Sequence, residues 1–409
     1  MTTASHRRQP IHVVYGGAHL FKAETAAKLG TTALRVFHEH APDPAALAAV
    51  LGLTSETAAK VHARVTEKLQ REPVEDFRLD FEDGYGNRPD AEEDGHAQSA
   101  AAEVAAGAKR GTLPPFIGIR IKNLGDELRE RALRTTHLFL ERLLKDNDGH
   151  VPPNFVVTLP KITLSGQVST LVDAFAKIET VYRLAPGTLR MELMVETPQT
   201  IFDERGAVAL PGLVKEGRGR ISAAHFGTYD YTASLGITAS HQHMRHPACD
   251  FARSVMQVAL AGTDVCLSDG ATNVLPVGND RAAIHRAWRH HYDDIRHSLT
   301  NAFYQGWDLH PAQLVTRYAA VYAFFMESLD AASERLRNFI GKAAQATLVG
   351  EVFDDAATGQ GLLNFFLRAL NCGAVREEEI GALTGLTLEE LRSGSFVKIV
   401  KGRRDGPTA

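Results

Sequence analysis

The stretch RLDFEDGYG, residues 78–86, predicts a β-strand that runs into a glycine turn, yet it carries the carboxylates of Asp80, Glu82 and Asp83. Acidic side chains are poor strand formers, and burying an unpaired carboxylate costs several kcal/mol. Either this is a solvated edge strand, or the charges at its end meet a cation. The rest of the chain distinguishes the two, because similar strand ends recur along it.

Short apolar runs bounded by turn residues alternate with longer segments that have helical spacing. In residues 168–184, for example, apolar residues recur three and four apart, as in a helix that packs one face on a sheet. This alternation is typical of βα units with a parallel sheet. Eight predicted strands with helical crossovers indicate an α/β fold, a (β/α)8 TIM barrel. The predicted strands lie within residues 11–17, 76–84, 116–123, 155–162, 190–197, 221–230, 264–270 and 305–314.

Two regions are additional to a minimal barrel. Residues 18–75 predict a helical insertion between the first two strands, and the sequence after His310 predicts further amphipathic helices towards the C-terminus. We therefore expect a catalytic barrel domain over residues 1–315 and a C-terminal helical extension over residues 316–409.

The composition restricts the class of partner. With 409 residues, of which 44% are hydrophobic, the chain can bury a full core. It has no apolar run that would make a signal peptide or the roughly 20-residue span of a bilayer, so we expect a cytoplasmic protein with no membrane partner. Three widely spaced cysteines argue against a disulfide framework. The 45 basic and 49 acidic residues leave no electrostatic footprint for nucleic acid, so the expected partner is a small molecule.

Charged residues stand where the predicted strands end. In a TIM barrel the reactive residues lie at the C-terminal ends of the strands and in the loops that follow. A polar residue at one such end is equally well explained by the return of the chain to water, but the same feature on most of eight strands indicates a site. The residues in strand order are Glu82, Asp83, Arg120, Lys122, Lys161, Glu196, Asp230, Asp269 and His310.

Glu196 and Asp230 end adjacent predicted strands, so both carboxylates can reach one ion. Two carboxylates, waters and a chelating substrate are the usual ligands of Mg²⁺, with Mn²⁺ as the alternative metal. Glu82 and Asp83 would accept hydrogen bonds from the waters on the metal. Arg120 supplies a planar donor fork for a substrate carboxylate or a developing enolate oxygen, and a metal beside an arginine suggests enolate stabilisation.

The series LDFEDG, GIRIKN, TLPKI, VETPQTI, HFGTYDYTASLG and GWDLHPAQL, within residues 76–315, resembles the successive strand-end motifs of a known group. The group is the citrate lyase β-subunit and malyl-CoA lyase-like branch of the HpcH/HpaI aldolase superfamily. The resemblance implies reversible cleavage or formation of a carbon–carbon bond through a metal-bound enolate. It also implies a homo-oligomer in which a C-terminal element often packs on a neighbouring subunit.

The same resemblance assigns roles to individual residues. Glu196 and Asp230 match the magnesium ligands, and Arg120 matches the arginine that holds the substrate carboxylate. Glu82 and Asp83 match the acidic pair behind the metal waters. The remaining match, Lys161, is a lysine of the same pocket.

Two motifs depart from the family. The first strand, IHVVYGGAHLF (11–21), lacks the basic pattern of CoA-using relatives, and Asp83-Gly84-Tyr85 stands where the 2-oxo acid aldolases carry a histidine. The expected substrate is a small carboxylate such as pyruvate or oxaloacetate, with a CoA thioester as an open alternative. The candidates for the general base are His310, His225, or Glu351, Asp354 and Asp355 of a neighbouring subunit.

Two functions of different classes fit these residues. The leading hypothesis is a magnesium-dependent carbon–carbon lyase of the aldolase or citrate lyase type, acting through a metal-stabilised enolate of a small 2-oxo acid or acyl thioester. The rival is a non-catalytic metabolite-binding barrel that serves as a sensor or as a subunit of a larger assembly. Glu196, Asp230 and Arg120 together favour the enzyme, because a binding protein needs no metal beside an arginine.

The histidine-rich stretches 241–246 and 285–297 offer a further metal candidate. His291, Asp294 and His297 share one face of a predicted helix, but a zinc site needs a closed set of ligands and an open position. We favour a solvated helix face rich in histidine and arginine. The Gly-Gly of YGGAH (15–19) is equally well explained by a tight βα turn as by a phosphate loop.

Overall fold

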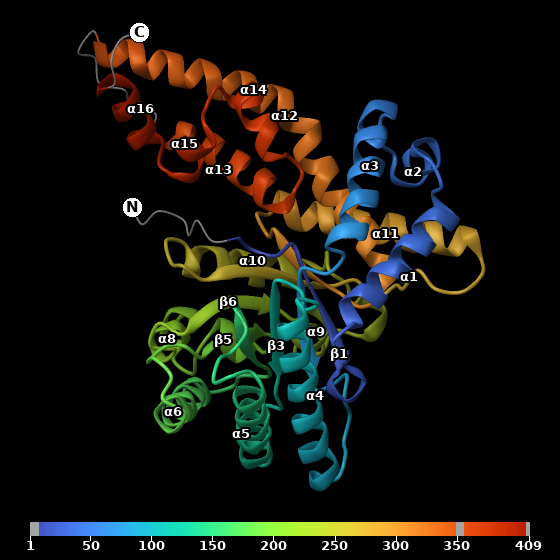
Figure 1. Ribbon diagram of the computed structural model, residues 1–409, viewed down its shortest axis with the longest axis vertical. Coiled ribbons are helices and arrows are strands. Elements are labelled where there is room, and N and C mark those ends of the chain that lie inside the picture. Colours follow the sequence, from blue (N-terminus) through green and yellow to red (C-terminus); the bar gives the residue numbers. More distant parts are fainter. Residues whose placement is uncertain (1–7, 349–355, 406–409) are drawn as a thin grey trace.

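The computed structural model describes residues 8–348 and 356–405. Its strands form one closed barrel in which each strand pairs in parallel with the next, and β8 closes on β1 (Figure 1). The predicted TIM barrel is confirmed, and each strand lies within a predicted apolar run, except that β7 extends one residue beyond its run. The strands are β1 (His12–Gly17), β2 (Asp76–Asp80), β3 (Phe116–Arg120), β4 (Phe155–Leu159), β5 (Arg190–Val195), β6 (Ile221–Phe226), β7 (Cys266–Ala271) and β8 (Gln305–Asp308).

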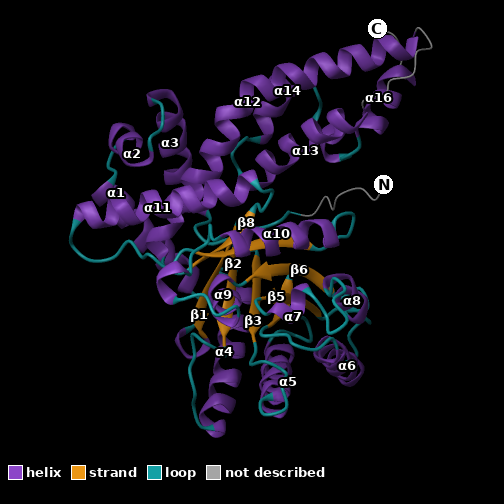
Figure 2. Cartoon of the chain, turned by 180° about the vertical axis from the view of Figure 1, so that it is seen from behind, coloured by secondary structure: helices purple, strands orange, loops and turns teal. Residues whose placement is uncertain are grey.

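Helices surround the barrel, as Figure 2 shows. A buried strand such as β4, whose five residues are all buried, needs cover on its outer face, and the apolar sides of the helices provide it. These helices are α4 (Asp90–Arg110), α5 (Arg129–Asp146), α6 (Gly166–Val181), α7 (Pro198–Ile201), α8 (Leu210–Glu216), α9 (Thr228–Ser234), α10 (Pro247–Leu260), α11 (Arg281–Thr300) and α12 (Pro311–Leu348). Short 3₁₀ turns lie at Ala18–Leu20 and Ala239–His241.

The predicted insertion contains α1 (Thr25–His40), α2 (Pro44–Leu51) and α3 (Ser55–Arg71). Local sequence sets the limits of α2: the Asp43 carboxylate accepts a hydrogen bond from the N–H of Ala46 at 2.8 Å, Pro44 begins the helix, and Gly52 ends it. The insertion packs on α12, where the Tyr318 hydroxyl donates to the carbonyl of Pro73 at 3.0 Å.

The C-terminal extension contains α13 (Ala356–Cys372), a 3₁₀ turn at Glu377–Glu379, α14 (Ile380–Thr384), α15 (Leu388–Arg392) and α16 (Phe396–Asp405). It lies at the end of the molecule away from α4 and α5 (Figures 1 and 2). The boundary predicted between residues 315 and 316 falls inside α12. The first part of this helix packs on the barrel, and its later part belongs to the extension. Packing of the extension on a neighbouring subunit stays a prediction.

A buried ionic network crosses the interior of the barrel. Arg78 of β2 bonds to Glu192 of β5 at 2.5 Å and also to Asp76, and His225 of β6 lies 2.9 Å from the same Glu192 carboxylate. Burial opposes the ionisation of Glu192, but Arg78 and His225 outweigh it and hold its pKa at about 2. Because β2 and β5 are not neighbours, this contact crosses the interior of the barrel. The network therefore fills the interior below the strand ends.

None of the helices in the ranges that the structure describes has the length and apolar character that a bilayer crossing requires. Cys249, Cys266 and Cys372 are free thiols.

Candidate active site

The C-terminal ends of strands β2 to β6 bring the predicted site residues together, except for Lys122, Asp269 and His310. The Lys161 ammonium bonds to Glu82, lies 3.0 Å from both carboxylate oxygens of Asp83 and is 3.8 Å from Asp230. One guanidinium nitrogen of Arg120, Nη1, is 3.3 Å from Glu82. The site is deepest at Arg120, which is buried, and opens to solvent at Asp83 and Asp230, whose side chains are 58% and 43% exposed. We call these residues, together with Glu196, the strand-end site.

Glu196 lies at the bottom of this site, after β5. Its side chain is buried and accepts a hydrogen bond from the backbone N–H of Lys161 at 2.7 Å. Burial and the neighbouring Asp230 carboxylate raise the pKa of Glu196 to about 7. Gly227 makes room for it, because a Cβ at that position would lie 2.5 Å from the Cβ of Glu196. Glu196 therefore carries a charge that its surroundings compensate poorly.

Lys161 contributes both backbone and side chain to the site. Its φ of 49° is in the left-handed region, which is uncommon for residues other than glycine. In this conformation its backbone N–H donates a hydrogen bond to Glu196. Burial favours the neutral amine, but the hydrogen bonds to Glu82 and Asp83 outweigh it and raise the pKa of Lys161. Lys161 is consequently a fixed ammonium at neutral pH and cannot act there as a base.

Asp80 positions two parts of the site, a role that the sequence analysis missed. Its carboxylate accepts from Nε and Nη2 of Arg120 at 2.8 and 2.5 Å, and also from the N–H groups of Glu82 and Gly84 at 3.0 and 2.7 Å. Asp80 thus holds the arginine and the β2–α4 loop in one arrangement. Since it occupies one edge of the guanidinium, a substrate would meet the Nη1 end of Arg120.

Two aromatic residues, also missed from the sequence, enclose Arg120. Its guanidinium carbon is 4.8 Å from the ring centroid of Tyr15 on β1 and 5.3 Å from that of Trp307 on β8. The two rings contact each other at 4.3 Å. The buried indole N–H of Trp307 has no hydrogen-bond partner among the described residues. This N–H is an available hydrogen-bond donor beside the arginine. The sequence alone does not show that Trp307 lies near Arg120, because that depends on the pairing of β1 with β8.

The two candidate general bases that the structure describes, His310 and His225, lie away from the strand-end carboxylates. His310 accepts the N–H of Ala312 at 3.1 Å and so caps the start of α12, and burial lowers its pKa. The described residues give it no contact with the strand-end carboxylates. His225 is buried in the lumen with Glu192. The remaining candidates, Glu351, Asp354 and Asp355, lie outside the described residues.

Two other predicted strand-end charges also serve packing. Asp269 pairs with Arg253 at 2.9 Å, and Lys122 bonds to Glu93 at 2.5 Å. Both pairs are buried. They are structural ion pairs away from Lys161 and Glu196.

The solvated face predicted within residues 285–297 is wrong for two of its members. His291 is fully buried between Thr316 and Asp308, with its ring nitrogens 2.6 and 3.1 Å from their oxygens, and Asp294 is also buried. The helix α11 turns this face towards the barrel, whereas His297 is only partly buried. No three His, Cys, Asp or Glu side chains converge as a metal site within residues 8–348 and 356–405.

The family model for a domain of unknown function, DUF6986, matches residues 3–399. No curated protein matches the sequence. Among solved structures, a citrate lyase from Burkholderia xenovorans LB400 is 18% identical with a TM-score of 0.56, over 90% of this chain and 96% of that one. The malate synthase of Haloferax volcanii is 13% identical with a TM-score of 0.50, over 97% and 98% in its lead(II) complex and 98% and 99% in its magnesium/glyoxylate complex. At these identities the likeness establishes the fold, and it confirms at that level the resemblance to the citrate lyase group.

Proposed function

The chain belongs to the family of the domain of unknown function DUF6986, and we propose that it is a magnesium-dependent carbon–carbon lyase. The substrate would be a small 2-oxo acid or an acyl thioester that reacts as its enolate at the strand-end site. The fold supports this proposal, since one similar structure is a citrate lyase and another is a malate synthase complex with magnesium and glyoxylate.

The observation that carries the proposal is the buried carboxylate of Glu196 beside Asp230. A carboxylate whose pKa is raised to about 7 by burial and by a second anion stores an unfavourable interaction. Structural carboxylates in the same barrel are compensated by arginine, as Asp80 is by Arg120 and Asp269 is by Arg253. Strongly perturbed carboxylates in a cleft that opens to solvent are typical of functional sites.

The donor set at Glu196 and Asp230 fits a hard divalent cation. Both ligands are oxygens, the charge of Glu196 is poorly compensated, and the exposed side of Asp230 leaves room for waters and a chelating substrate. When bound there, Mg²⁺ would polarise a carbonyl oxygen of the substrate. The Lys161 ammonium lies 3.8 Å from Asp230.

The residues of the chain would bind and orient the acid. Asp80 and the rings of Tyr15 and Trp307 fix the guanidinium of Arg120, so its Nη1 end is a preorganised donor for a carboxylate oxygen. The free indole N–H of Trp307 offers a second donor beside it. The Lys161 ammonium places a further positive charge where negative charge develops, and Glu82 holds that ammonium in position.

Hydrogen exchange tests the proposal without knowledge of the full substrate. We expect the methyl protons of pyruvate, or the α-protons of an acetyl thioester, to exchange with deuterated solvent in the presence of the protein and magnesium, as followed by proton NMR. Arg120→Lys should lower the exchange rate about 10²- to 10³-fold, because a point charge does not reproduce the planar donor group. Exchange of pyruvate alone favours an aldolase-like reaction, and exchange of the thioester favours an acyl-CoA lyase.

Arg218→Lys is the matched control, since Arg218 forms an exposed ion pair with Asp173 far from the strand ends. It should exchange at the wild-type rate. Binding of pyruvate or oxaloacetate without any exchange, at saturating magnesium, would instead support the non-catalytic metabolite-binding barrel.

A further inference from the structure

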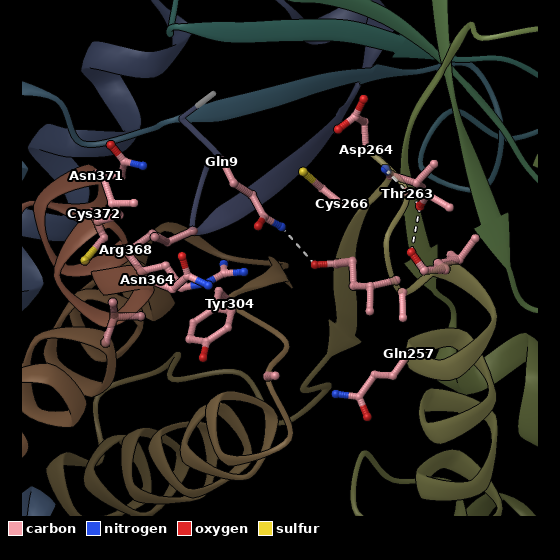
Figure 3. Close-up of a pocket in the computed structure, with 18 of the residues that line it drawn as sticks. Gln9, Gln257, Thr263, Asp264, Cys266, Tyr304, Asn364, Arg368, Asn371 and Cys372 are labelled. Atoms are coloured by element: carbon pink, nitrogen blue, oxygen red, sulfur yellow. Dashed lines mark hydrogen bonds between the residues drawn. The ribbon is translucent and has the colours of Figure 1, made fainter. Parts of the chain in front are cut away.

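A cavity lies at the opposite end of the barrel from the strand-end site. It has a volume of about 360 Å³ and is lined by the N-terminal ends of β1, β7 and β8 and by helices α10, α12 and α13. Figure 3 shows its lining residues. A cavity of this size is in the range that binds small organic molecules. We call it the floor cavity, because it lies between the barrel floor and the C-terminal extension.

Arg368 of α13 is the cationic group of the floor cavity. Its guanidinium carbon lies 3.9 Å from the ring centroid of Tyr304, and Figure 3 shows it beside Tyr304 and Asn364. Among the described residues it has no hydrogen bond or ion pair, in contrast to Arg253 and Arg120, which are each bonded to a carboxylate. A guanidinium is always charged and has five N–H donors. Arg368 therefore has donors to offer to an anion inside the cavity.

The rest of the lining divides into amide and apolar groups. The Oδ1 atom of Asn364 accepts from Gln360 at 2.9 Å, which leaves its NH₂ group available, whereas the amide of Gln9 is bonded to the Leu267 carbonyl at 2.9 Å. The acidic residue in the lining, Asp264, is exposed at the rim. The apolar wall includes Leu260, Val265, Leu267, Val321 and Phe325.

We propose that the floor cavity binds a small organic carboxylate with an apolar body. The carboxylate would bond to Arg368 and to the amide of Asn364, and the apolar body would lie against the side chains that line the barrel side. The ligand would contact both the barrel floor and α13, so its binding stabilises the docking of the extension. This site is separate from the strand-end site, and the inference does not rest on the proposed lyase activity.

Calorimetric titration with sodium hexanoate tests the site, with the neutral hexanamide as the matched probe. We expect hexanoate to bind and to raise the melting temperature, and hexanamide to bind much more weakly. Arg368→Met should weaken hexanoate binding about 10- to 100-fold, the usual effect of a hydrogen bond to a charged group. Arg335→Met, which removes an exposed arginine of α12, is the control and should bind like the wild type.

A second variant keeps the test independent of any defect in Arg368→Met. Ala261 is exposed at the cavity lining, so Ala261→Trp fills the space without disturbing the core and should abolish hexanoate binding. Alkylation by iodoacetamide, read by mass spectrometry, gives a local measure. Cys266 lines the cavity and is partly exposed, and hexanoate should protect it. Cys249 is buried, and burial raises its pKa to about 12, so it stays unmodified throughout.

The outcomes separate this site from the strand-end site. Glu196→Gln should bind hexanoate as the wild type does, and Arg368→Met should keep the hydrogen exchange of pyruvate or of the thioester. Equal binding of hexanoate and hexanamide, or undiminished binding by both Arg368→Met and Ala261→Trp, would overturn the proposal. If only Glu196→Gln lost hexanoate binding, the ligand would bind at the strand-end site, and this result would also overturn the proposal.

Discussion

Single residues of the strand-end site differ in how their charge is balanced. Asp80 is bonded to Arg120, and Glu82 is bonded to Lys161, whereas Glu196 accepts a backbone N–H and faces a second carboxylate. An ion pair makes burial of a carboxylate tolerable, and repulsion by a like charge adds to its cost. Glu196 is therefore the residue whose removal should stabilise the metal-free protein.

The pH dependence of stability tests this statement through Glu196→Gln. The pKa of Glu196 rises from 4.5 to about 7 on folding, so the folded state binds more protons than the unfolded state between these values and loses stability as the pH rises. At pH 8 without metal, the variant should be more stable than the wild type by up to about 3 kcal/mol, from about 2.5 units at 1.36 kcal/mol each. The difference should shrink towards zero by pH 4.5. Urea denaturation at several pH values measures it.

Magnesium should reverse that order. Added Mg²⁺ should raise the melting temperature of the wild type at pH 8 and leave Glu196→Gln unchanged, because an amide is a much poorer ligand for a hard cation. Equal magnesium stabilisation of both proteins would remove Glu196 from the metal site. A variant that is less stable than the wild type at pH 8 would show that the carboxylate is compensated after all.

The histidines of α11 give a second prediction at this scale. His291→Ala should lower the free energy of unfolding by roughly 2 kcal/mol or more, because it removes one buried hydrogen-bond partner from each of Asp308 and Thr316 and opens a cavity. His297→Ala should cost about 1 kcal/mol or less, since its bond to Asp250 is partly exposed. Chemical denaturation of the two variants checks the difference. Equal effects would show that the burial of His291 contributes nothing.

At the scale of elements, the turns that follow the strands position the residues of the strand-end site. The β2–α4 loop is held by Asp80, and the turn from β6 into α9 passes so close to β5 that it requires glycine at position 227. At the end of β1, a Cβ on Gly17 would lie 2.7 Å from the carbonyl of Gly84, so the Gly-Gly of β1 serves a close approach of two strand ends. The geometry of the strand-end site thus depends on backbone contacts as much as on charged side chains.

Gly227→Ala tests this dependence. The new methyl group meets both the Cβ and the carboxylate of Glu196, at 2.5 and 2.6 Å, so it should displace that side chain and abolish stabilisation by magnesium. We also expect a loss of about 1–3 kcal/mol from overpacking. Gly95→Ala in α4 is the control, because nothing lies within 4 Å of its Cβ position, and it should stabilise by up to about 1 kcal/mol. Unchanged magnesium stabilisation in Gly227→Ala would show that Glu196 is free to move.

At the scale of the whole molecule, barrel, insertion and extension share one hydrophobic core. Helix α12 runs from the barrel into the extension, and Leu47 of the insertion, Phe139 of the barrel and Leu363 of the extension belong to the same contiguous cluster. Arg64 of α3 forms a two-bond ion pair with Glu379 at 2.7 and 2.8 Å, which joins insertion and extension directly. Parts joined by a continuous helix and a common core should unfold together.

Leu363→Ala tests this coupling from the extension side. Leu363 is fully buried, so the change should cost about 2–5 kcal/mol. Both tryptophans, Trp288 and Trp307, belong to the barrel, and their fluorescence transition should fall in temperature together with the circular dichroism transition of all helices. Val397→Ala, at a half-exposed position of α16, is the control and should shift neither. A circular dichroism transition that falls alone would make the extension an independent unit.

The fold was largely predictable because its evidence is local. Each strand is a short apolar run bounded by turn residues, and each crossover carries helical spacing, so the order of elements alone indicates a parallel barrel. Helix contacts were less predictable. Residues 285–297 contain histidines and arginines that suggest a solvated face, yet Asp308 and Thr316 from distant segments bury His291. A polar side chain can be buried where another residue forms a hydrogen bond with it. The sequence of the helix itself does not show whether such a partner is present.

The sequence by itself determined that charged side chains would meet at one end of a barrel, because the C-terminal ends of parallel strands share one edge. That argument placed Glu82, Arg120, Lys161 and Glu196 in one site. Only the tertiary structure decided how those charges pair. The partners of Arg120 are a carboxylate on β2 and rings on β1 and β8, and closure of β8 onto β1 is what brings the rings together. Pairing depends on distances of a few ångströms between separate strands, and sequence spacing carries no information about them.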